Sequence, residues 1–568
     1  MRLSRSFHRT HCAALPAFTL LLAVLAFAAP AAGTGEAPLW GGLEAGPHAV
    51  GFMTFEEYDY GRTFQAKRDY FGEVIPGEKA RPVQVCVWYP AVEDEEAAPV
   101  LFSDYAFSPP EDQSFYPFLS AVQNREVAWL HRILMNNQNA VLEVLGMDMN
   151  AVRNARAADG AFPLLIYACD FDRGIGENAV LCEYLASHGY VVATCNALSA
   201  TSVRSQPGAA ALEAMIGDLE YLISALHGRD MIEPGRLGVI GYGGGGLAAL
   251  LLQMRNYNVD AVVTLAAGFA DEPRAEMVMT NPYYDIGRMT VPLLSIYMET
   301  ADGESSAPGE VFKYARRFMA EFPGTGPLEL TTYGLIPRAL MPPPEGEPPA
   351  GADAYKVLCD YALTFLDAHV RGSEDAIARL SASDLAVMDA EERPPTQDEF
   401  LAILNSGNIE AAIEIYDKFT AIDPELVLFP EANMNFAGYG MLQRGRTAEA
   451  VTLFKMNAET YPQSANCWDS LTEAYMANGD NEMALQCVEK VIQTLPNDTN
   501  LSPDLRQALE ANAVRYKEQL TGGGDTGDAG GGDEGDADAG RAEGGGEGDG
   551  GGEGGDDAEG VGSGDDSE

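Results

Sequence analysis

Short apolar runs and longer amphipathic stretches alternate along most of this chain. The apolar runs have strand length and cover residues 83–90, 162–170, 191–197, 237–240, 259–266, 291–298 and 328–334. The stretches between and after them have helical length and cover residues 181–190, 209–227, 247–254, 311–322 and 355–370. Apolar strands that alternate with helices are typical of parallel sheets covered on both sides. The pattern therefore predicts an α/β fold with a mostly parallel sheet, interrupted by a mostly helical insertion at about 101–156.

A different, all-helical pattern begins near residue 393. Ala450 and Ala484 are 34 residues apart, as are Pro462 and Pro496. This period and these residue types resemble the tetratricopeptide repeat, in which small residues lie where helices touch and proline ends the second helix. We therefore predict a tetratricopeptide repeat array over 393–520 that binds an unidentified protein or peptide.

The first residues have the composition of a secretory signal. Arg2, Arg5 and Arg9 precede an apolar run at 15–27, which small residues follow. This order is typical of a cleaved signal peptide, here over 1–32, and an uncleaved membrane anchor is the alternative. It predicts an exported protein, periplasmic or extracellular.

Composition sets the remaining boundaries and excludes some partners. The α/β domain is expected at 38–375, a charged linker at 376–392, and a disordered tail rich in Gly, Asp and Glu at 521–568. The tail holds sixteen acidic side chains and one arginine, so it contributes −15 to the net charge of −49. A chain this acidic repels nucleic acid and anionic membranes. No apolar run after the signal is long enough to span a bilayer.

A glycine-rich turn lies in the middle of the α/β domain. The predicted strand 237–240 leads into the sequence Gly-Tyr-Gly-Gly-Gly-Gly at 241–246, and a predicted helix and strand follow. A strand, a tight glycine turn and a helix form the usual place for a catalytic nucleophile or a phosphate cradle.

The α/β domain resembles the α/β-hydrolase family, in particular its members similar to dienelactone hydrolase and platelet-activating-factor acetylhydrolase. The resemblance covers roughly residues 48–372 and rests on the segments FPLLIYA, LCEYLASHGYVVAT, GDLEYLI, RLGVIGYGGGGLAAL and FLDAHVRG. It implies an elbow with the motif Gly-x-Ser-x-Gly, whose serine is the nucleophile. Gly241 and Gly245 match the flanking glycines, but Gly243 stands in the place of the serine.

The other catalytic residues implied by the resemblance are also incomplete. The family has a histidine in the loop after the last strand, here expected at 333–340. The chain has no histidine between His227 and His369. The acid of the triad is expected at Asp271 or Asp302, each at the end of a predicted strand.

The resemblance also implies two backbone amides that bind an oxyanion. One is the amide of Gly244, and the other lies in the loop that begins at Cys169. That loop contains Asp170 and Asp172. Their negative charges oppose oxyanion binding if their side chains face the site.

These observations predict an exported hydrolase-like protein that has lost its catalytic residues. We expect it to act as a binding or scaffold protein, with a small apolar ligand in the hydrolase-like pocket and a protein or peptide on the repeats. No cofactor and no metal are expected.

Two other functions stay open. One is an active ester or acyl hydrolase with a different nucleophile, for which Cys169 or a serine at 199, 202 or 205 is available, although none has an evident base. The other is dinucleotide binding through the pattern Gly241-x-Gly243-x-x-Gly246, although the next strand does not end in the acidic residue that binds the ribose.

Overall fold

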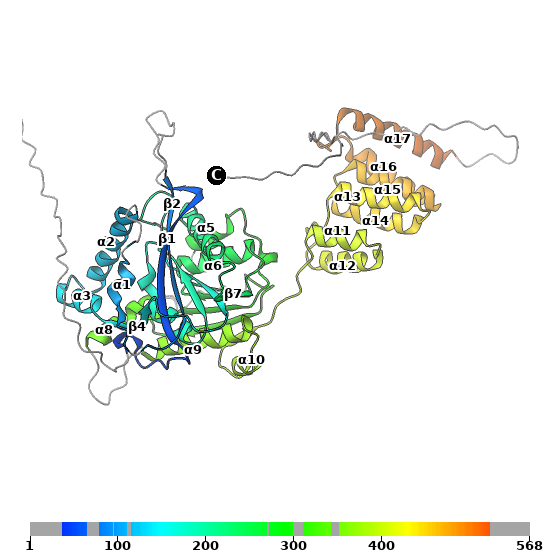
Figure 1. The fold of residues 1–568 in the computed structure, drawn as a ribbon. Coiled ribbons are helices and arrows are strands. Elements are labelled where there is room, and N and C mark those ends of the chain that lie inside the picture. Colours follow the sequence, from blue (N-terminus) through cyan, green and yellow to red (C-terminus); the bar gives the residue numbers. More distant parts are fainter. Residues whose placement is uncertain are drawn as a thin grey trace, which may run out of the picture. The chain divides into compact units, whose positions relative to one another are not determined.

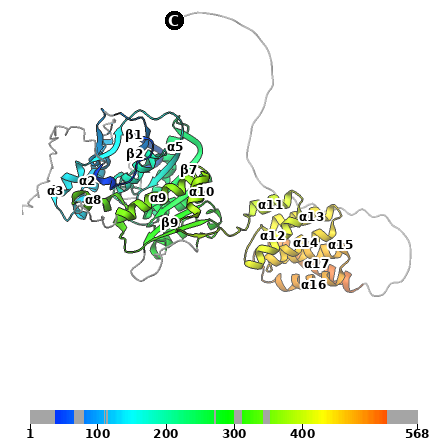
Figure 2. The ribbon, with the colours of Figure 1, turned by 90° about the horizontal axis from the view of Figure 1, so that it is seen from below.

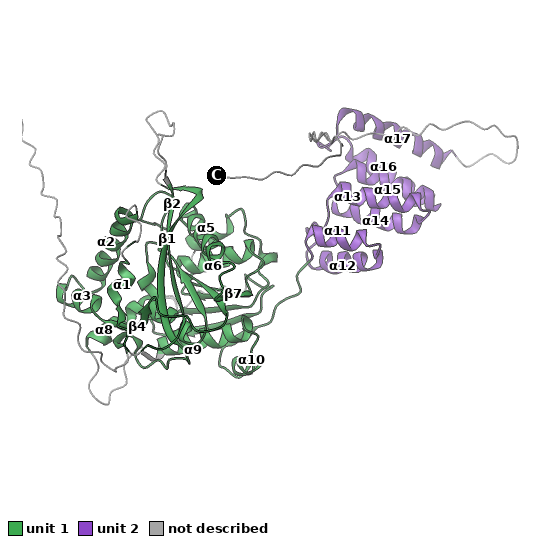
Figure 3. Cartoon of the chain, viewed as in Figure 1, with its two compact units in different colours: residues 1–394 green, residues 395–568 purple. Residues whose placement is uncertain are grey.

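The computed structural model describes residues 37–64, 79–94, 96–108, 110, 115–269, 272–298, 311–341 and 352–522. The chain divides into two compact units, Met1–Pro394 and Pro395–Glu568 (Figure 3). The predicted signal peptide lies outside the described residues, as does the predicted tail beyond residue 522.

Unit 1 is built on one sheet of eleven strands in the order β11-β10-β9-β8-β7-β5-β6-β2-β1-β4-β3 (Figure 1). In chain order the strands are β1 (Ala49–Phe64), β2 (Lys79–Ala91), β3 (Pro99–Leu101), β4 (Asp148–Arg153), β5 (Phe162–Ala168), β6 (Val191–Thr194), β7 (Ile232–Tyr242), β8 (Ala261–Leu265), β9 (Leu293–Met298), β10 (Arg317–Phe322) and β11 (Ala386–Met388). Strands β5 to β10 run parallel to one another, whereas β2 is antiparallel to both of its neighbours. The predicted mostly parallel sheet is confirmed.

Helices cover both faces of this sheet (Figures 1 and 2). One face packs against α4 (Ala179–Ser187), α8 (Thr332–Leu340), α9 (Ala352–His369) and α10 (Glu374–Ser381), and the other against α5 (Ala209–Leu226), α6 (Gly244–Arg255) and α7 (Glu272–Met279). Successive residues of β5 serve the two faces in turn. Leu165 and Tyr167 belong to one core, and Leu164 and Ile166 to the other, because side chains alternate along a strand.

The helical insertion lies between β3 and β4. It contains α1 (Phe102–Ala106), α2 (Tyr116–Ile133) and α3 (Gln138–Leu145). Strand β4 pairs with β1 and with β3, so the insertion also extends the sheet beyond β1. The mostly helical character of this segment agrees with the prediction, whereas the strands β3 and β4 and the long strand β1 were not predicted.

Two predicted elements near the end of unit 1 are wrong. Residues 311–322 do not form a helix, because β10 occupies 317–322 and pairs with β9 along its whole length. Residues 328–334 do not form a strand. They contain the end of the short helix η5 (Pro327–Leu330) and the start of α8, where Leu330, Tyr333 and Ile336 enter the core at helical spacing.

Part of the predicted linker 376–392 belongs to unit 1. Helix α10 packs on the core through Ala376 and Leu380. Strand β11 pairs with β10 in antiparallel register at the edge of the sheet.

The described part of unit 2 is all-helical, as predicted. Its helices are α11 (Gln397–Asn405), α12 (Ile409–Ile422), α13 (Glu431–Gln443), α14 (Thr447–Thr460), α15 (Ala465–Asn478), α16 (Asn481–Thr494) and α17 (Pro503–Thr521). Helices α13 and α15 begin 34 residues apart, and so do α14 and α16. Gly438 of α13 lies against the ring of Phe454 of α14, the kind of close helix contact that the repeat pattern requires. None of the described helices is both long and apolar enough to cross a membrane.

Candidate active site

The glycine turn has the strand, tight turn and helix that the resemblance implies for a nucleophile elbow. Strand β7 ends at Tyr242, and α6 begins at Gly244. Gly243, between them, has φ 55° and ψ −120°, a left-handed conformation that glycine adopts without steric cost. Its amide donates a hydrogen bond of 2.8 Å to the carbonyl oxygen of Leu265 in the next strand. The structure therefore places this residue where the resemblance puts the serine.

The flanking glycines are explained by packing. A Cβ atom on Gly241 would lie 2.2 Å from the carbonyl oxygen of Gly245, and one on Gly245 would lie 2.0 Å from that of Ala168. Helix α6 therefore starts in close contact with the ends of β5 and β7. The packing alone explains why glycine occupies both positions, so their presence is no evidence for a bound dinucleotide pyrophosphate.

The side chain of Asp170 fills the space above Gly243. A Cβ atom placed on Gly243 would lie 2.6 Å from both Cγ and Oδ1 of this aspartate. The amide of Gly244 donates a hydrogen bond of 2.6 Å to Oδ1. This amide is the donor that the resemblance assigns to an oxyanion, so a carboxylate of the chain itself occupies the oxyanion position. The partial positive charge at the start of α6 stabilises it there.

A buried carboxyl group holds the backbone of Asp170. Its amide donates to Oε2 of Glu177 at 3.1 Å, and the hydroxyl of Tyr167 donates to the same oxygen at 2.8 Å. Glu177 lies in the short helix η3 (Ile175–Asn178) and is fully buried. Burial raises the pKa of Glu177 well above its usual value, and the nearby charge of Asp170 raises it further. The loop after β5 is thus fixed with an acidic side chain directed at the elbow.

Cys169 does not have the environment of a reactive thiol. Its side chain is buried, with Sγ 3.4 Å from the carbonyl oxygen of Gly174. Burial raises the pKa of this thiol well above its usual value, and the nearby carboxyl of Glu177 raises it further. Because the thiolate is the nucleophilic form, Cys169 is poorly suited to replace the missing serine.

The loop after the last parallel strand, where the resemblance implies a histidine, contains none. The last parallel strand is β10, so the loop in question is 323–326 rather than 333–340, and it contains no histidine. His369 lies on α9 between the rings of Phe318 and Phe365. Burial lowers its pKa to about 4, as for a packing residue. Both candidate acids, Asp271 and Asp302, lie outside the described residues.

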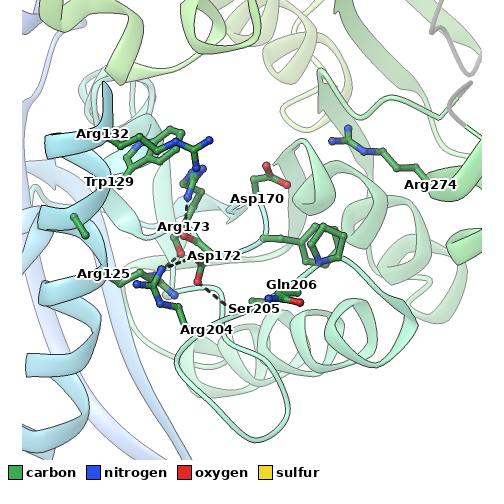
Figure 4. A pocket seen from close by; sticks show the side chains of 13 residues that line it. Arg125, Trp129, Arg132, Asp170, Asp172, Arg173, Arg204, Ser205, Gln206 and Arg274 are labelled. Atoms are coloured by element: carbon green, nitrogen blue, oxygen red, sulfur yellow. Dashed lines mark hydrogen bonds and ion pairs between the residues drawn. The ribbon is translucent and has the colours of Figure 1, made fainter. Parts of the chain in front are cut away.

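A cavity of about 520 Å³ opens beside the elbow (Figure 4). Asp170 and Phe171 line it next to the glycine turn, and α2 contributes Trp129 from the helical insertion. Its most frequent lining residue is arginine, present at Arg125, Arg132, Arg173, Arg204 and Arg274. None of these arginines was predicted from the sequence as a site residue.

Two of the five arginines are paired with acidic side chains. Arg125 is buried, and its guanidinium lies 3.0 Å from Oε1 of Glu126 and donates to three backbone carbonyls. Arg204 lies 3.0 Å from Oδ2 of Asp172. Asp172 therefore does not face the elbow as a second free carboxylate.

Comparisons with known proteins add little to this geometry. No protein-family model matches the chain, and no curated protein matches it. Among solved structures, a ferulic acid esterase from Streptomyces cinnamoneus is similar, with 22% sequence identity over 57% of this chain and 91% of that chain, and a TM-score of 0.40. The assignment of the fold therefore rests on the strand order and on the elbow itself.

Proposed function

We propose that unit 1 is a binding domain with a hydrolase fold that does not hydrolyse esters. One observation carries this proposal. The carboxylate of Asp170 fills the space where a side chain of residue 243 would lie, and it accepts the hydrogen bond of the amide that would bind an oxyanion. Loss of a triad serine alone lowers turnover by about 10⁶. Loss of one oxyanion donor lowers it by a further ~10²–10³.

The position of Asp170 also acts against a substitute nucleophile. Attack on an ester carbonyl puts negative charge on its oxygen, which the amide of Gly244 would have to stabilise. That amide is already bonded to a carboxylate, and the negative charge of this group repels the oxyanion.

The helical hairpins of unit 2 support a second part of the proposal. We infer that they form a tetratricopeptide-type array whose concave face holds a protein or peptide. The motif at the start of the sequence supports export of the protein, so the partner belongs outside the cytoplasm. The whole chain then joins a ligand-binding domain to a partner-binding array.

Labelling with a fluorophosphonate tests the loss of hydrolase chemistry. The full chain is incubated with the reagent and assayed with p-nitrophenyl acetate and butyrate, beside an active serine esterase as positive control. We expect neither labelling nor turnover above the buffer rate. Labelling or turnover that disappears in Cys169→Ala or Ser205→Ala refutes the proposal and identifies the nucleophile.

A further inference from the structure

The cavity beside the elbow has a charge opposite to that of the chain. Its thirteen lining residues include five arginines and two aspartates, whereas the whole chain has 36 basic and 85 acidic residues. A cavity with low-dielectric walls and one sign of charge concentrates ligands of the opposite sign. The local composition therefore indicates an anionic ligand, rather than the small apolar ligand expected from the sequence.

Three of the guanidinium groups have no ion pair with an acidic side chain of the described residues. They belong to Arg132, Arg173 and Arg274. Figure 4 shows the first two on one side of Asp170 and the third on the other. These three groups face one carboxylate, so the cavity has a net charge near +2 after its internal pairs are formed.

A tryptophan positions two of these guanidinium groups. The guanidinium carbon of Arg173 lies 3.4 Å from the centroid of a ring of Trp129, and that of Arg132 lies 5.6 Å from it. Stacking of this kind fixes a planar guanidinium while its N–H groups stay available at the edge. Arg173, whose Nη1 also donates to the carbonyl oxygen of Asp172 at 2.9 Å, is thus held in place beside the cavity, and the exposed Arg132 lies near the same ring with donors for a phosphate or a carboxylate.

Two buried polar atoms in the lining also lack a hydrogen-bond partner among the described residues. One is Oγ of Ser205, whose residue is 2% exposed, and the other is Nε1 of Trp129. Buried polar atoms of this kind normally have a partner, supplied by the protein, by water or by a ligand. Both groups can donate a hydrogen bond, as an anionic ligand requires.

We propose that this cavity binds a small organic polyanion, a phosphate monoester or a di- or tricarboxylate, and that Arg132 and Arg173 are its main contacts. The ligand's negative groups lie toward these arginines and away from Asp170, whose charge repels them. Bound in this way, the ligand is held without being cleaved. The inference extends the proposed function to a ligand class and rests on it.

Binding is measured by isothermal titration calorimetry on the full chain with four probes. Phenyl phosphate and citrate carry two or more charges at pH 7.5, benzoate carries one, and benzamide is neutral. We expect at least one of the first two to bind, benzoate to bind at least about tenfold more weakly, and benzamide not to bind. Raising the salt concentration weakens the binding. Binding by phenyl phosphate alone identifies a phosphate site, and binding by citrate alone identifies a carboxylate site.

Matched arginine variants separate the site from general charge. Arg132→Gln and Arg173→Gln are each expected to raise Kd about tenfold or more, because each removes a charge-assisted donor. Arg229→Gln is the control, since Arg229 also stacks on an aromatic ring, Phe55, at 4.3 Å, but does not line the cavity. Arg132 is exposed, so its substitution leaves folding intact. The far- and near-ultraviolet circular dichroism spectra of the Arg132→Gln variant are compared with those of the unchanged chain.

The outcomes distinguish this inference from the proposed function. No binding by phenyl phosphate or citrate at 10 mM, or binding that is equal in Arg132→Gln, Arg173→Gln and the control, overturns the polyanion site. Release of phenol from phenyl phosphate, or of nitrophenol from the ester probes, overturns the non-hydrolytic function while leaving the anion site in place.

Discussion

A methyl group at Gly243 tests whether Asp170 occupies the place of the nucleophile. In Gly243→Ala the new Cβ would lie 2.6 Å from Cγ and Oδ1 of Asp170, so the carboxylate has to turn away. It then loses the 2.6 Å hydrogen bond from the amide of Gly244. The substitution therefore acts on the backbone of the turn and on the carboxylate that covers it.

The expected cost has two parts. A side chain at φ 55° and ψ −120° costs about 1–2 kcal/mol, because residues other than glycine rarely adopt this backbone conformation. Loss of a hydrogen bond to a charged group costs about 1.5–3 kcal/mol. The sum is about 3–5 kcal/mol of unfolding free energy. With Asp170→Ala already present, only the backbone part of about 1–2 kcal/mol remains, so the coupling in the double-mutant cycle is about 2–3 kcal/mol.

The free energy of unfolding is measured by urea titration with tryptophan fluorescence. All variants carry Trp468→Phe, so that the remaining tryptophans Trp40, Trp88 and Trp129 report on unit 1 alone. Gly243→Ala in the Asp170→Ala background is the matched control for the backbone part, since the same residue with the same φ and ψ then lacks only the carboxylate.

An additive cycle would refute the placement of Asp170. If Gly243→Ala costs the same with and without the Asp170 carboxylate, that group does not fill the space above the turn. The central observation behind the proposed function then fails.

Two further predictions concern unit 2. Gly438→Ala puts Cβ 2.6 Å from the ring of Phe454, so it should destabilise the unit by about 1–3 kcal/mol. Gly440→Ala is the control and should not destabilise it, because the nearest atom to the added Cβ is 3.8 Å away. Thermal melts compare the two variants. Burial raises the pKa of Asp469 to about 7 from an ordinary 3.8, so the folded state retains a proton that the unfolded chain releases. Stability should therefore fall as pH rises from about 4 to 7, by an amount on the order of 4 kcal/mol. Asp469→Asn should abolish this fall, whereas Asp504→Asn, at an exposed position, should leave it unchanged. The urea midpoint is measured over a pH series for the unchanged chain and for both variants. Parallel curves for the three proteins contradict the prediction.

The alternation of apolar runs was sufficient to predict the central sheet, because buried parallel strands have few polar residues. The runs at 162–170, 191–197 and 237–240 all overlap neighbouring parallel strands. The end of unit 1 was harder to predict. The segment 317–322 has few β-branched residues and becomes a strand only because β9 offers it a pairing edge, whereas β-branched residues at 328–334 suggested a strand where the fold requires a helix.

The site was predictable only where its residues lie close together in sequence. The missing serine and histidine could be seen from the glycine turn and its motif. The arginines of the cavity come from α2, from the loops after β5 and β6, and from α7, and only the fold brings these elements together. One local signal was present: Arg125, Trp129 and Arg132 have the spacing of one helix face, in a chain poor in basic residues. The direction of the Asp170 side chain had no sequence signal, since it depends on Glu177 and on the amide of Gly244.

Glycine at position 243 changes what the elbow can do. With a serine, the left-handed turn is strained, and the strain is useful because it presents a nucleophile. With glycine the same turn has little conformational strain, and it still exposes the amide of Gly244 at the positive end of α6. Asp170 accepts a hydrogen bond from this amide, so the position that the resemblance assigns to an oxyanion is filled by an internal contact. In the proposed site the charges open to a ligand are those of Arg132, Arg173 and Arg274, none of which has an ion pair with an acidic side chain of the described residues. The proposal therefore assigns recognition of the ligand to these arginines and gives the chemistry of a nucleophile elbow no part in it.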